Sequence, residues 1–327
     1  MKYPKFVNEN STIGVTALSA GVGGYLDDYL KSINSLKKNG FNIYETKSVR
    51  NCGNVSNTGE VRALEFEEVI TNSDVDMIMC ATGGDFLIET LPHINFDLLN
   101  SNIKWVMGAS DPTSILYIIT TKLDIATLYG LNSCSYDQEV LHESLLNSIE
   151  IMKGNLIVQN SYELFEKDKE GRELGYNLTE NVYWETLNGD VNISGRIIGG
   201  CIDCLMNLLG TKYDYTKEFI ERYKDDGIIW YFDVFALSSE DLYRTLFQMR
   251  EAGWFSYVKG VIVGRVLIQN TFTDVTYTEA LKRIFGNIPI IYNADIGHVA
   301  PKMTIINGAI ANIDAKDGKG TISFELL

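Results

Sequence analysis

The sequence predicts an α/β protein in which a mostly parallel, helix-flanked N-terminal sheet is followed by a second α+β domain rich in β-hairpins. Strand-like and helix-like segments alternate along the first 130 residues, as in parallel sheets with helices on both faces. The second half instead carries apolar strands separated by Gly-containing turns. The chain of 327 residues, 45% of them hydrophobic, is long enough for two such domains.

In the first half, apolar runs indicate strands with helices between them. The helix predicted over 25–40 ends at Gly40, a residue typical of helix C-termini. The predicted strands are TIGVTAL (12–18), FNIYETK (41–47), VDMIMCAT (75–82), KWVMGA (104–109) and IATLYG (125–130), and further helices are predicted over 58–72, before KWVMGA and from TSILYIITTKL (113–123) onward. Ligands bind beyond the carboxyl ends of the strands in such sheets, where Gly83, Gly84 and Ser110 fall.

The second half is predicted to contain a connecting segment and an α+β domain. Residues 156–188 are polar and Tyr-rich with Gly turns, which indicates an interdomain connection with some strand content. The predicted domains are therefore 1–155 and 189–327. Within the second domain we expect strands in GIIWYFDVF (227–235), VKGVIVGRV (258–266) and IPIIYNADIGH (288–298), a helix in SSEDLYRTLFQMREAGWF (238–255), and short strands around a tight turn at Asp317-Gly318.

Charge and cysteine content argue against several classes of protein. The formal net charge of −15 argues against binding to a nucleic-acid backbone, which needs clustered Lys and Arg. No apolar run approaches the roughly 20 residues that cross a bilayer, and the first residues show no signal-peptide core. We therefore expect a cytoplasmic protein without membrane partners. The five Cys residues are scattered, which fits a reducing compartment better than a disulfide framework.

Two of these cysteines, Cys201 and Cys204, form a CxxC motif in GGCIDCLMNLLG, which is predicted to begin a buried helix. No second CxxC and no nearby His in the sequence completes a zinc site. We interpret both as core cysteines, and we expect neither a metal nor another cofactor.

The stretch MGASDPTSILY (107–117) allows two interpretations. Its Ser, Asp and Pro suit a helix start, because Ser and Asp cap helix N-termini and Pro fits the first helical position. Alternatively, Ser110 is a nucleophile held on a tight strand-to-helix turn. A serine hydrolase also needs a His, an acid that orients it and donors for the oxyanion. The amide of Asp111 and the strand end at Gly83-Gly84 offer such donors.

The chain has only three His residues, so few candidates for the base exist. His93 and His142 are expected on the surface or at helix ends. His298 follows a strand in the turn DIGHVAPK, where it is either a cleft residue or a surface-loop His. The apolar strand IIWYF ends at Asp233, a carboxylate that we expect to be partly buried and to need a partner.

Six segments spread over nearly the whole chain match a known family in order and spacing. They are TALS after the first strand, ATGGD…LPHINFD, GASDPT, GRIIGG, the strand ending at Asp233, and GHVAPKMTIINGAIANID. Each segment is weak alone, but their order and spacing together are specific. On this basis the chain resembles the LD-carboxypeptidase family of serine peptidases (S66), including the branch similar to microcin C self-immunity peptidases.

The resemblance implies a Ser–His–Glu triad shared between the two domains, the first of them flavodoxin- or glutamine-amidotransferase-like. Carried over to this chain, it makes Ser110 the nucleophile and His298 the base. It assigns the oxyanion donors to the amides of Gly84 and Asp111, with Gly83 beside the substrate. It further implies a homodimer that cleaves an amide bond near a free carboxyl terminus, in a murein-derived L,D-peptide or a peptide-like antibiotic such as microcin C.

The chain departs from the family pattern at the acid, because Asp233 stands where the family has Glu. Asp is one methylene shorter, about 1.5 Å of reach. Either the backbone lies closer to the base, or a water bridges the two side chains, or the triad is impaired. Glu240 and Asp241 are fallback acids, with helix capping as the alternative. ATGGDF also lacks the Tyr that often follows the paired Gly in murein-cleaving members, which favours the antibiotic-immunity branch.

Three further residues are candidates for substrate contacts. Arg196 either faces a substrate carboxylate or forms a structural ion pair, since guanidinium groups match carboxylates in both settings. Trp184 and Tyr183 form either an aromatic wall or part of the core. Two other functions are kept as hypotheses: a catalytically impaired homologue that binds peptides, and a nucleotide-binding kinase suggested by TGGD and SAGVGG, although no P-loop Lys follows them.

Overall fold

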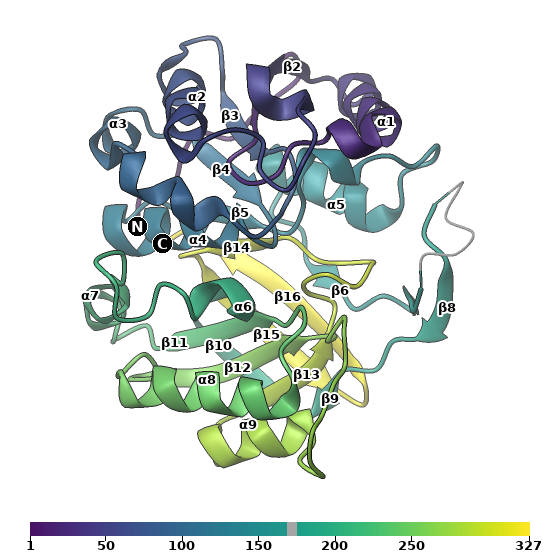
Figure 1. Ribbon diagram of the computed structural model, residues 1–327. Coiled ribbons are helices and arrows are strands. Elements are labelled where there is room, and N and C mark those ends of the chain that lie inside the picture. The colour runs from purple at the N-terminus through teal and green to yellow at the C-terminus, as the bar shows by residue number, and fades with distance from the viewer. Residues whose placement is uncertain (169–174) are drawn as a thin grey trace. The chain divides into compact units, whose positions relative to one another are not determined.

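The computed structural model describes residues 1–168 and 175–327, and these residues divide into two compact units (Figure 1). The first unit consists mainly of Met1–Asn155 together with Thr304–Ile306. The second consists mainly of Asn177–Met303 and Asn307–Leu327. Residues 169–174 of the predicted connecting segment 156–188 lie outside the described residues.

The sheet of the first unit has the strand order β2-β1-β3-β4-β5, with β14 beyond β5. Its bounds are β1 Thr12–Thr16, β2 Asn42–Glu45, β3 Met77–Cys80, β4 Trp105–Gly108, β5 Thr127–Tyr129 and β14 Ile305–Asn307. Strands β1 to β5 are parallel, as predicted. β3 and β4 are buried along their whole length, which is typical of a parallel sheet covered on both faces. The sequence did not predict that β14, from near the end of the chain, joins this sheet.

Helices connect the parallel strands by crossovers. The helices are α1 Leu26–Lys38, α2 Gly59–Thr71, α3 Phe96–Ser101, α4 Thr113–Leu123 and α5 Glu143–Met152, with short 3₁₀ turns η1 Gly23–Tyr25, η2 Lys47–Arg50, η3 Leu87–Glu89, η4 Leu91–His93 and η5 Ser133–Ser135. Right-handed crossovers place α1 on one face of the sheet and α2, α3 and α4 on the other. In agreement, α2, α3 and α4 pack in a row, whereas α1 packs on η5.

The order of the first sheet creates a switch point between β1 and β3. From β1 the chain crosses to β2 on one side, and from β3 it crosses to β4 on the other side. In open α/β sheets, ligands bind beyond the carboxyl ends of the strands at such a point. The loops that follow β1, β3 and β4 are therefore the ones to examine for a site.

The second unit contains an eight-stranded sheet in the order β6-β16-β15-β10-β11-β12-β13-β9, and a separate pair, β7-β8. Its bounds are β6 Gln159–Asn160, β7 Leu164–Glu166, β8 Leu178–Asn181, β9 Glu185–Thr186, β10 Val191–Cys201, β11 Ile228–Asp233, β12 Val258–Gly264, β13 Ile290–Ala294, β15 Ile310–Lys316 and β16 Lys319–Glu325. The hairpin predicted at Asp317-Gly318 joins β15 to β16. The four central strands, β10 to β13, are parallel, and antiparallel strands flank them.

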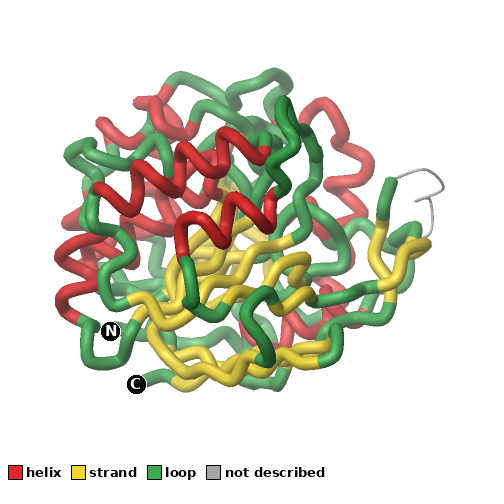
Figure 2. The backbone as a smooth tube through the Cα atoms, turned by 90° about the horizontal axis from the view of Figure 1, so that it is seen from below, coloured by secondary structure: helices red, strands yellow, loops and turns green. Residues whose placement is uncertain are grey.

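Helices of the second unit are α6 Ile202–Leu205, α7 Thr216–Arg222, α8 Ser239–Glu251 and α9 Tyr277–Phe285. α8 begins as predicted, because the Ser238 hydroxyl accepts a hydrogen bond from the Asp241 amide at 3.1 Å. α8 and α9 pack against each other and lie in front of the strands in Figure 2. All six residues of β11 are buried.

One predicted boundary is wrong. GGCIDCLMNLLG was expected to begin a helix, but Gly199, Gly200 and Cys201 still belong to β10. Their register with β11 continues to the pair Cys201–Asp233, so the ladder extends to the end of both strands. The helix that follows, α6, has only four residues.

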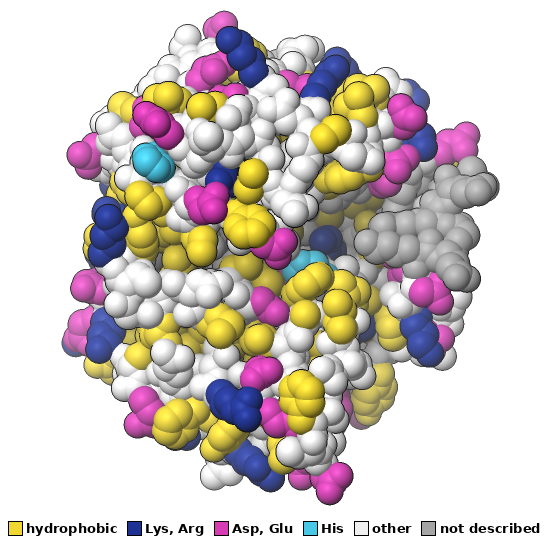
Figure 3. Space-filling model, in the orientation of Figure 1, with side chains coloured by type: hydrophobic (Ala, Val, Ile, Leu, Met, Phe, Trp, Pro, Cys, Tyr) yellow, Lys and Arg dark blue, Asp and Glu magenta, His cyan; other side chains and the backbone are white. Residues whose placement is uncertain are grey.

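The surface carries charges of both signs. Figure 3 shows Lys and Arg side chains scattered among Asp and Glu over the face that it draws, without a gathered basic patch among the described residues there. This distribution offers no support for binding to a phosphate backbone. None of the described helices combines the length and the apolar character needed to cross a membrane.

Candidate active site

Ser110 lies on a strained turn between β4 and α4. Its φ angle is +69°, in the left-handed region that non-glycine residues rarely adopt. The Ser110 amide donates a hydrogen bond to the Tyr129 hydroxyl at 3.3 Å, which ties the turn to the end of β5. A serine in this conformation at the carboxyl edge of a parallel sheet resembles the elbow that presents a nucleophile.

The interpretation of Ser110 and Asp111 as side-chain caps of α4 is wrong. The residue before α4 is Pro112, and no side chain caps the helix. The carbonyls of Ser110 and Asp111 instead accept hydrogen bonds from the amides of Thr113 and Ser114, at 2.8 and 3.1 Å. The start of α4 is therefore stabilised by the backbone of the turn.

The side chain of Asp111 joins three loops. Its carboxylate accepts hydrogen bonds from the hydroxyl of Ser19, after β1, and from the amide of Leu87, after β3, the latter at 2.8 Å. Burial raises the pKa of this carboxyl, and the two hydrogen bonds oppose that shift. From the sequence, Asp111 was expected to act as a helix cap or through its amide, and the link that its side chain makes between the loops was not predicted.

Gly83 and Gly84 bring the loop after β3 against Ser110. A Cβ atom on Gly83 would lie only 2.9 Å from the Cβ of Ser110. Gly84 has a φ of +148°, and a Cβ atom there would collide with the hydroxyl of Ser19. Within the described part of the chain, the amides of Gly84 and Asp111 have no hydrogen-bond acceptor. Two backbone donors beside a strained serine are the groups that an oxyanion needs.

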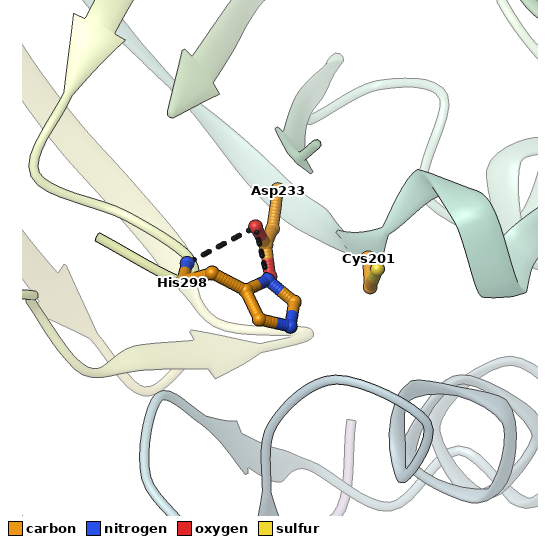
Figure 4. Close-up of side chains that lie close together, drawn as sticks. All are labelled: Cys201, Asp233 and His298. Atoms are coloured by element: carbon orange, nitrogen blue, oxygen red, sulfur yellow. Dashed lines mark hydrogen bonds and ion pairs between the residues drawn. The ribbon is translucent and has the colours of Figure 1, made fainter. Parts of the chain in front are cut away.

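In the second unit, His298 and Asp233 form a hydrogen-bonded pair (Figure 4). Asp233 is the last residue of β11 and is fully buried. Nδ1 of His298 lies 2.9 Å from Oδ1 and 2.8 Å from Oδ2, and the His298 amide donates to Oδ1 at 3.2 Å. Because a carboxylate only accepts, Nδ1 carries the proton of the neutral ring and Nε2 is its basic nitrogen. Figure 4 shows Nε2 on the side of the ring away from Asp233.

Gly297 allows the short aspartate side chain to reach His298. Its φ is +100°, and a Cβ atom at this position would collide with Oδ1 of Asp233. The loop therefore lies close to the end of β11, and the hydrogen bond is direct. Three outcomes were considered for Asp in place of Glu: a backbone closer to the base, a bridging water, or an impaired triad. The geometry agrees with the first, because the backbone of the His298 loop lies close enough for a direct hydrogen bond. The ring of Phe235, with its centroid 4.8 Å from that of His298, packs against the imidazole.

Cys201 lies beside this pair (Figure 4). It ends β10 in register with Asp233, and its Sγ, one carboxylate oxygen of Asp233 and one ring nitrogen of His298 all lie within 4.8 Å of one another. A hydrogen bond with Cys204 raises the pKa of the Cys201 thiol, as do burial and the charges of Asp233 and Asp203. The cluster is not recognisable in the sequence, because no His lies near the CxxC motif along the chain and the fold brings His298 from a distant loop.

Arg196 lies at the opposite end of the strands. It is in register with Ile228, the first residue of β11, whereas Asp233 is the last. Its guanidinium donates to Asp226 at 2.5 and 2.9 Å and to two backbone carbonyls. The structure thus shows the structural ion pair, and the predicted contact with a substrate carboxylate gains no support.

His142 and the two fallback acids make local hydrogen bonds, and His93 lies on the surface. His142 caps α5 by accepting a hydrogen bond from a backbone amide at 3.1 Å, and His93 is exposed. Glu240 accepts hydrogen bonds from the amides of residues 272–273, and Asp241 accepts from the cap residue of its own helix.

The two aromatic candidates differ in exposure. Trp184 is fully buried, and its Nε1 donates to Asp295 at 2.8 Å, which is a core role. Tyr183 is 62% exposed and lines a cavity of about 500 Å³ in the second unit. The wall of this cavity includes Arg265 and Val299, the residue that follows His298.

The first unit thus holds a serine on a strained turn and the second a His paired with a buried carboxylate, and both are residue types that hydrolytic enzymes use. The family model for the LD-carboxypeptidase N-terminal domain matches residues 13–130, and that for the LD-carboxypeptidase C-terminal domain matches residues 194–313. The chain therefore belongs to the LD-carboxypeptidase family, peptidase family S66. The resemblance predicted from the sequence is confirmed.

Individual relatives are named as carboxypeptidases or as immunity proteins. A putative carboxypeptidase of Treponema pallidum is 25% identical over 266 residues, covering 78% of this chain and 75% of the relative. The microcin C7 self-immunity protein MccF of Escherichia coli is 24% identical over 313 residues, covering 88% and 85%.

Solved structures confirm the fold. An MccF-like protein from Streptococcus pneumoniae in complex with AMP has a TM-score of 0.80 at 27% identity, covering 97% of this chain and 99% of that one. MccF in complex with aspartyl sulfamoyl adenosine has a TM-score of 0.84 at 20% identity, covering 99% of each chain. The latter likeness concerns the fold alone.

Proposed function

We propose that this chain is a serine-type carboxypeptidase whose triad consists of Ser110, His298 and Asp233. The observation that carries the proposal is the direct hydrogen bond from His298 to the buried carboxylate of Asp233, at 2.9 Å. That bond fixes the ring tautomer that leaves Nε2 as a base. The strained turn at Ser110 supports the assignment of the nucleophile, and membership of the family supports peptidase chemistry.

In the first half of the proposed reaction, Oγ of Ser110 attacks the carbonyl carbon of the scissile amide. Nε2 of His298 takes the hydroxyl proton, and Asp233 stabilises the resulting imidazolium. The amides of Gly84 and Asp111 donate to the oxyanion of the tetrahedral intermediate. Donors of this kind each contribute roughly 10²- to 10³-fold to kcat.

The second half of the reaction releases the two products in turn. The imidazolium of His298 returns its proton to the leaving nitrogen, and the C–N bond breaks to leave an acyl ester on Ser110. Water then attacks the ester with Nε2 again acting as base, and the carboxylic acid is released. No proton is gained or lost by the enzyme over the cycle.

For the substrate, we propose a peptide-like compound with a scissile amide close to a free carboxyl terminus. The relative solved with AMP binds a nucleotide, which favours a peptide-like antibiotic of the microcin C type over a murein L,D-peptide. The cavity lined by Tyr183 and Val299 is a candidate for the part of the substrate remote from the bond. The homodimer and the cytoplasmic location expected from the sequence stay predictions.

The test combines covalent labelling with a comparison of substrates. A serine-directed phosphonate should modify Ser110 in the wild-type protein, and mass spectrometry of peptides should locate the adduct there. Hydrolysis of aminoacyl-sulfamoyl adenylates should exceed that of murein tetrapeptides. Ser110→Ala should lower kcat by a factor on the order of 10⁶. A folded protein that is never labelled at Ser110, and whose cleavage activity survives Ser110→Ala, would refute the proposal.

A further inference from the structure

Three different metal-binding side chains converge at the carboxyl edge of the second unit's sheet. They are the thiol of Cys201, the carboxylate of Asp233 and the imidazole of His298, and one ligand atom from each lies within 4.8 Å of the others (Figure 4). Cys201 and Asp233 end neighbouring strands in register, so the backbone itself places them together. His298 is held to Asp233 by two hydrogen bonds, one from its ring and one from its amide.

These spacings are close to those of a zinc site. Zinc bonds of about 2.0 Å to nitrogen or oxygen and 2.3 Å to sulfur give tetrahedral edges of about 3.3–3.8 Å. The three ligand atoms lie within 4.8 Å of one another, a limit that exceeds such an edge by about 1.0–1.5 Å. Side-chain torsions would therefore have to change on metal binding to close that difference.

Cys204 is the candidate for a fourth ligand: it is not one of the three residues whose ligand atoms lie within 4.8 Å of one another, but it contacts one of them. Its thiol is hydrogen-bonded to that of Cys201, and it is partly exposed, so an ion can approach from solvent on that side. Two thiols, one imidazole and one carboxylate form a set that suits zinc, because thiolates and imidazole favour it over magnesium or calcium.

The charges around the cluster also favour a cation. Asp233 is fully buried, and an oxygen of Asp203 lies 3.8 Å from Sγ of Cys201. The Asp203 carboxylate accepts hydrogen bonds from the amides of Phe235 and Ala236, which hold it in place. A divalent ion would neutralise this negative charge and displace the thiol protons to solvent.

We propose that Cys201, Cys204, Asp233 and His298 form a zinc-binding site that, when occupied, switches off the base of the hydrolase. The inhibitory part rests on the proposed function. Zinc bound at Nε2 would occupy the lone pair that must accept the Ser110 proton. Zinc bound at Nδ1 would move the ring proton to Nε2. In either case the imidazole can no longer act as a base.

Binding is tested on the full-length protein, reduced and freed of metal, by titration with Co²⁺ as a spectroscopic substitute for zinc. We expect a thiolate-to-cobalt absorption band that saturates at one ion per chain and disappears when zinc is added. Cys201→Ser and Cys204→Ser should each weaken binding by more than about 100-fold, the upper range for changes outside the ligand shell. The exposed Cys52 provides the control, because Cys52→Ser should leave the band and the affinity unchanged.

The inhibitory role is tested by hydrolysis with zinc and after addition of a chelator. We expect zinc to lower the hydrolysis rate of the wild type by at least about tenfold, and the chelator to restore it. In Cys204→Ser, the rate with zinc and the rate with chelator should be nearly equal. The absence of a thiolate band, or a band that survives both Cys201→Ser and Cys204→Ser with the fold intact by circular dichroism, would overturn the metal site. If labelling of Ser110 fails but the band is present, the hydrolase proposal falls and the metal site stands.

Discussion

Asp233 and His298 are joined by a direct hydrogen bond, with Nδ1 2.9 Å from Oδ1, although the resemblance to the family implied a longer glutamate at this position. The Asp233 side chain is shorter than that of a glutamate, and the close approach of the backbone at Gly297 compensates for the difference. Gly297 carries no Cβ, so the loop that holds His298 lies against the carboxylate. An aspartate and a glycine in the neighbouring loop thus act together.

Replacement of Gly297 by Ala is expected to disrupt the pair. A Cβ at this position would collide with Oδ1 of Asp233, and the φ of +100° is unfavourable for alanine. We expect kcat to fall by about 100-fold, as for a displacement of about 1 Å in a catalytic group. Stability is also expected to decrease, by more than about 1 kcal/mol. Steady-state kinetics and urea unfolding measure the two effects.

Gly210→Ala is a control that separates the effect of the positive φ angle from the effect of the collision with Asp233. Gly210 lies in the same unit with a φ of +72°, but a Cβ there would have no atom within 4 Å. It should therefore lose comparable stability and keep its kcat. Equal losses of kcat in the two variants would contradict the role assigned to Gly297.

Asp233→Asn is expected to lower kcat by about 10⁴-fold, because an amide can donate to Nδ1 and so stabilises the wrong ring tautomer. The substitution keeps the size of a fully buried side chain, so the fold should persist. Asp241→Asn is the matched control, since this fallback acid lies at the start of α8 and binds Ser238. A loss of only a few-fold in Asp233→Asn, or a large loss in Asp241→Asn, would remove Asp233 from the triad.

The sequence predicted those features that depend on neighbours along the chain. The five parallel strands of the first unit, the start of α8 at Ser238 and the hairpin at Asp317-Gly318 follow from local patterns of apolar, capping and turn residues. Two features could not be predicted from local patterns: β14 joins the sheet of the first unit, and four strands of the second unit are parallel. Both depend on pairing between distant segments.

In the candidate site, too, features that depend on neighbours along the chain were predictable, and features that depend on distant segments were not. The motif around Ser110 and the loop of Gly84 were recognisable in the sequence. Three features were not recognisable: the hydrogen bonds of the Asp111 side chain, the need for a glycine at position 297, and the position of Cys201 beside Asp233. Each of these depends on which strand ends become neighbours. For Arg196 the sequence left a substrate contact and a structural ion pair open, and the ion pair with Asp226 became visible only in the structure.

The buried carboxyl of Asp111 should make stability depend on pH. Burial raises its folded-state pKa above the ordinary value of 3.8, so the folded protein binds the proton more tightly than the unfolded chain. The stability that this proton contributes is fully present below pH 3.8 and is lost as the pH rises through the folded pKa. Asp111→Asn removes the titration.

The measurement is the free energy of unfolding of wild type minus that of Asp111→Asn, from urea denaturation at several pH values. This difference should increase as the pH falls from neutral toward 3.8, by about 1.4 kcal/mol for each unit by which the pKa is raised. A difference that is constant, or that decreases on acidification, would show that the carboxyl is not destabilised by burial.

Arg196→Ala should affect stability and not substrate binding. The arginine is 4% exposed and paired with Asp226, and it also packs over the ring of Tyr223 at 4.2 Å. Removing one partner of such a pair costs about 3 kcal/mol, the lower end for buried pairs, because Asp226 stays partly exposed. KM should change by less than about twofold, because a lost substrate contact would cost more. Arg250→Ala, which breaks a surface pair with Glu251, should cost less than about 1 kcal/mol. A large rise in KM for Arg196→Ala with little loss of stability would instead place Arg196 in contact with the substrate.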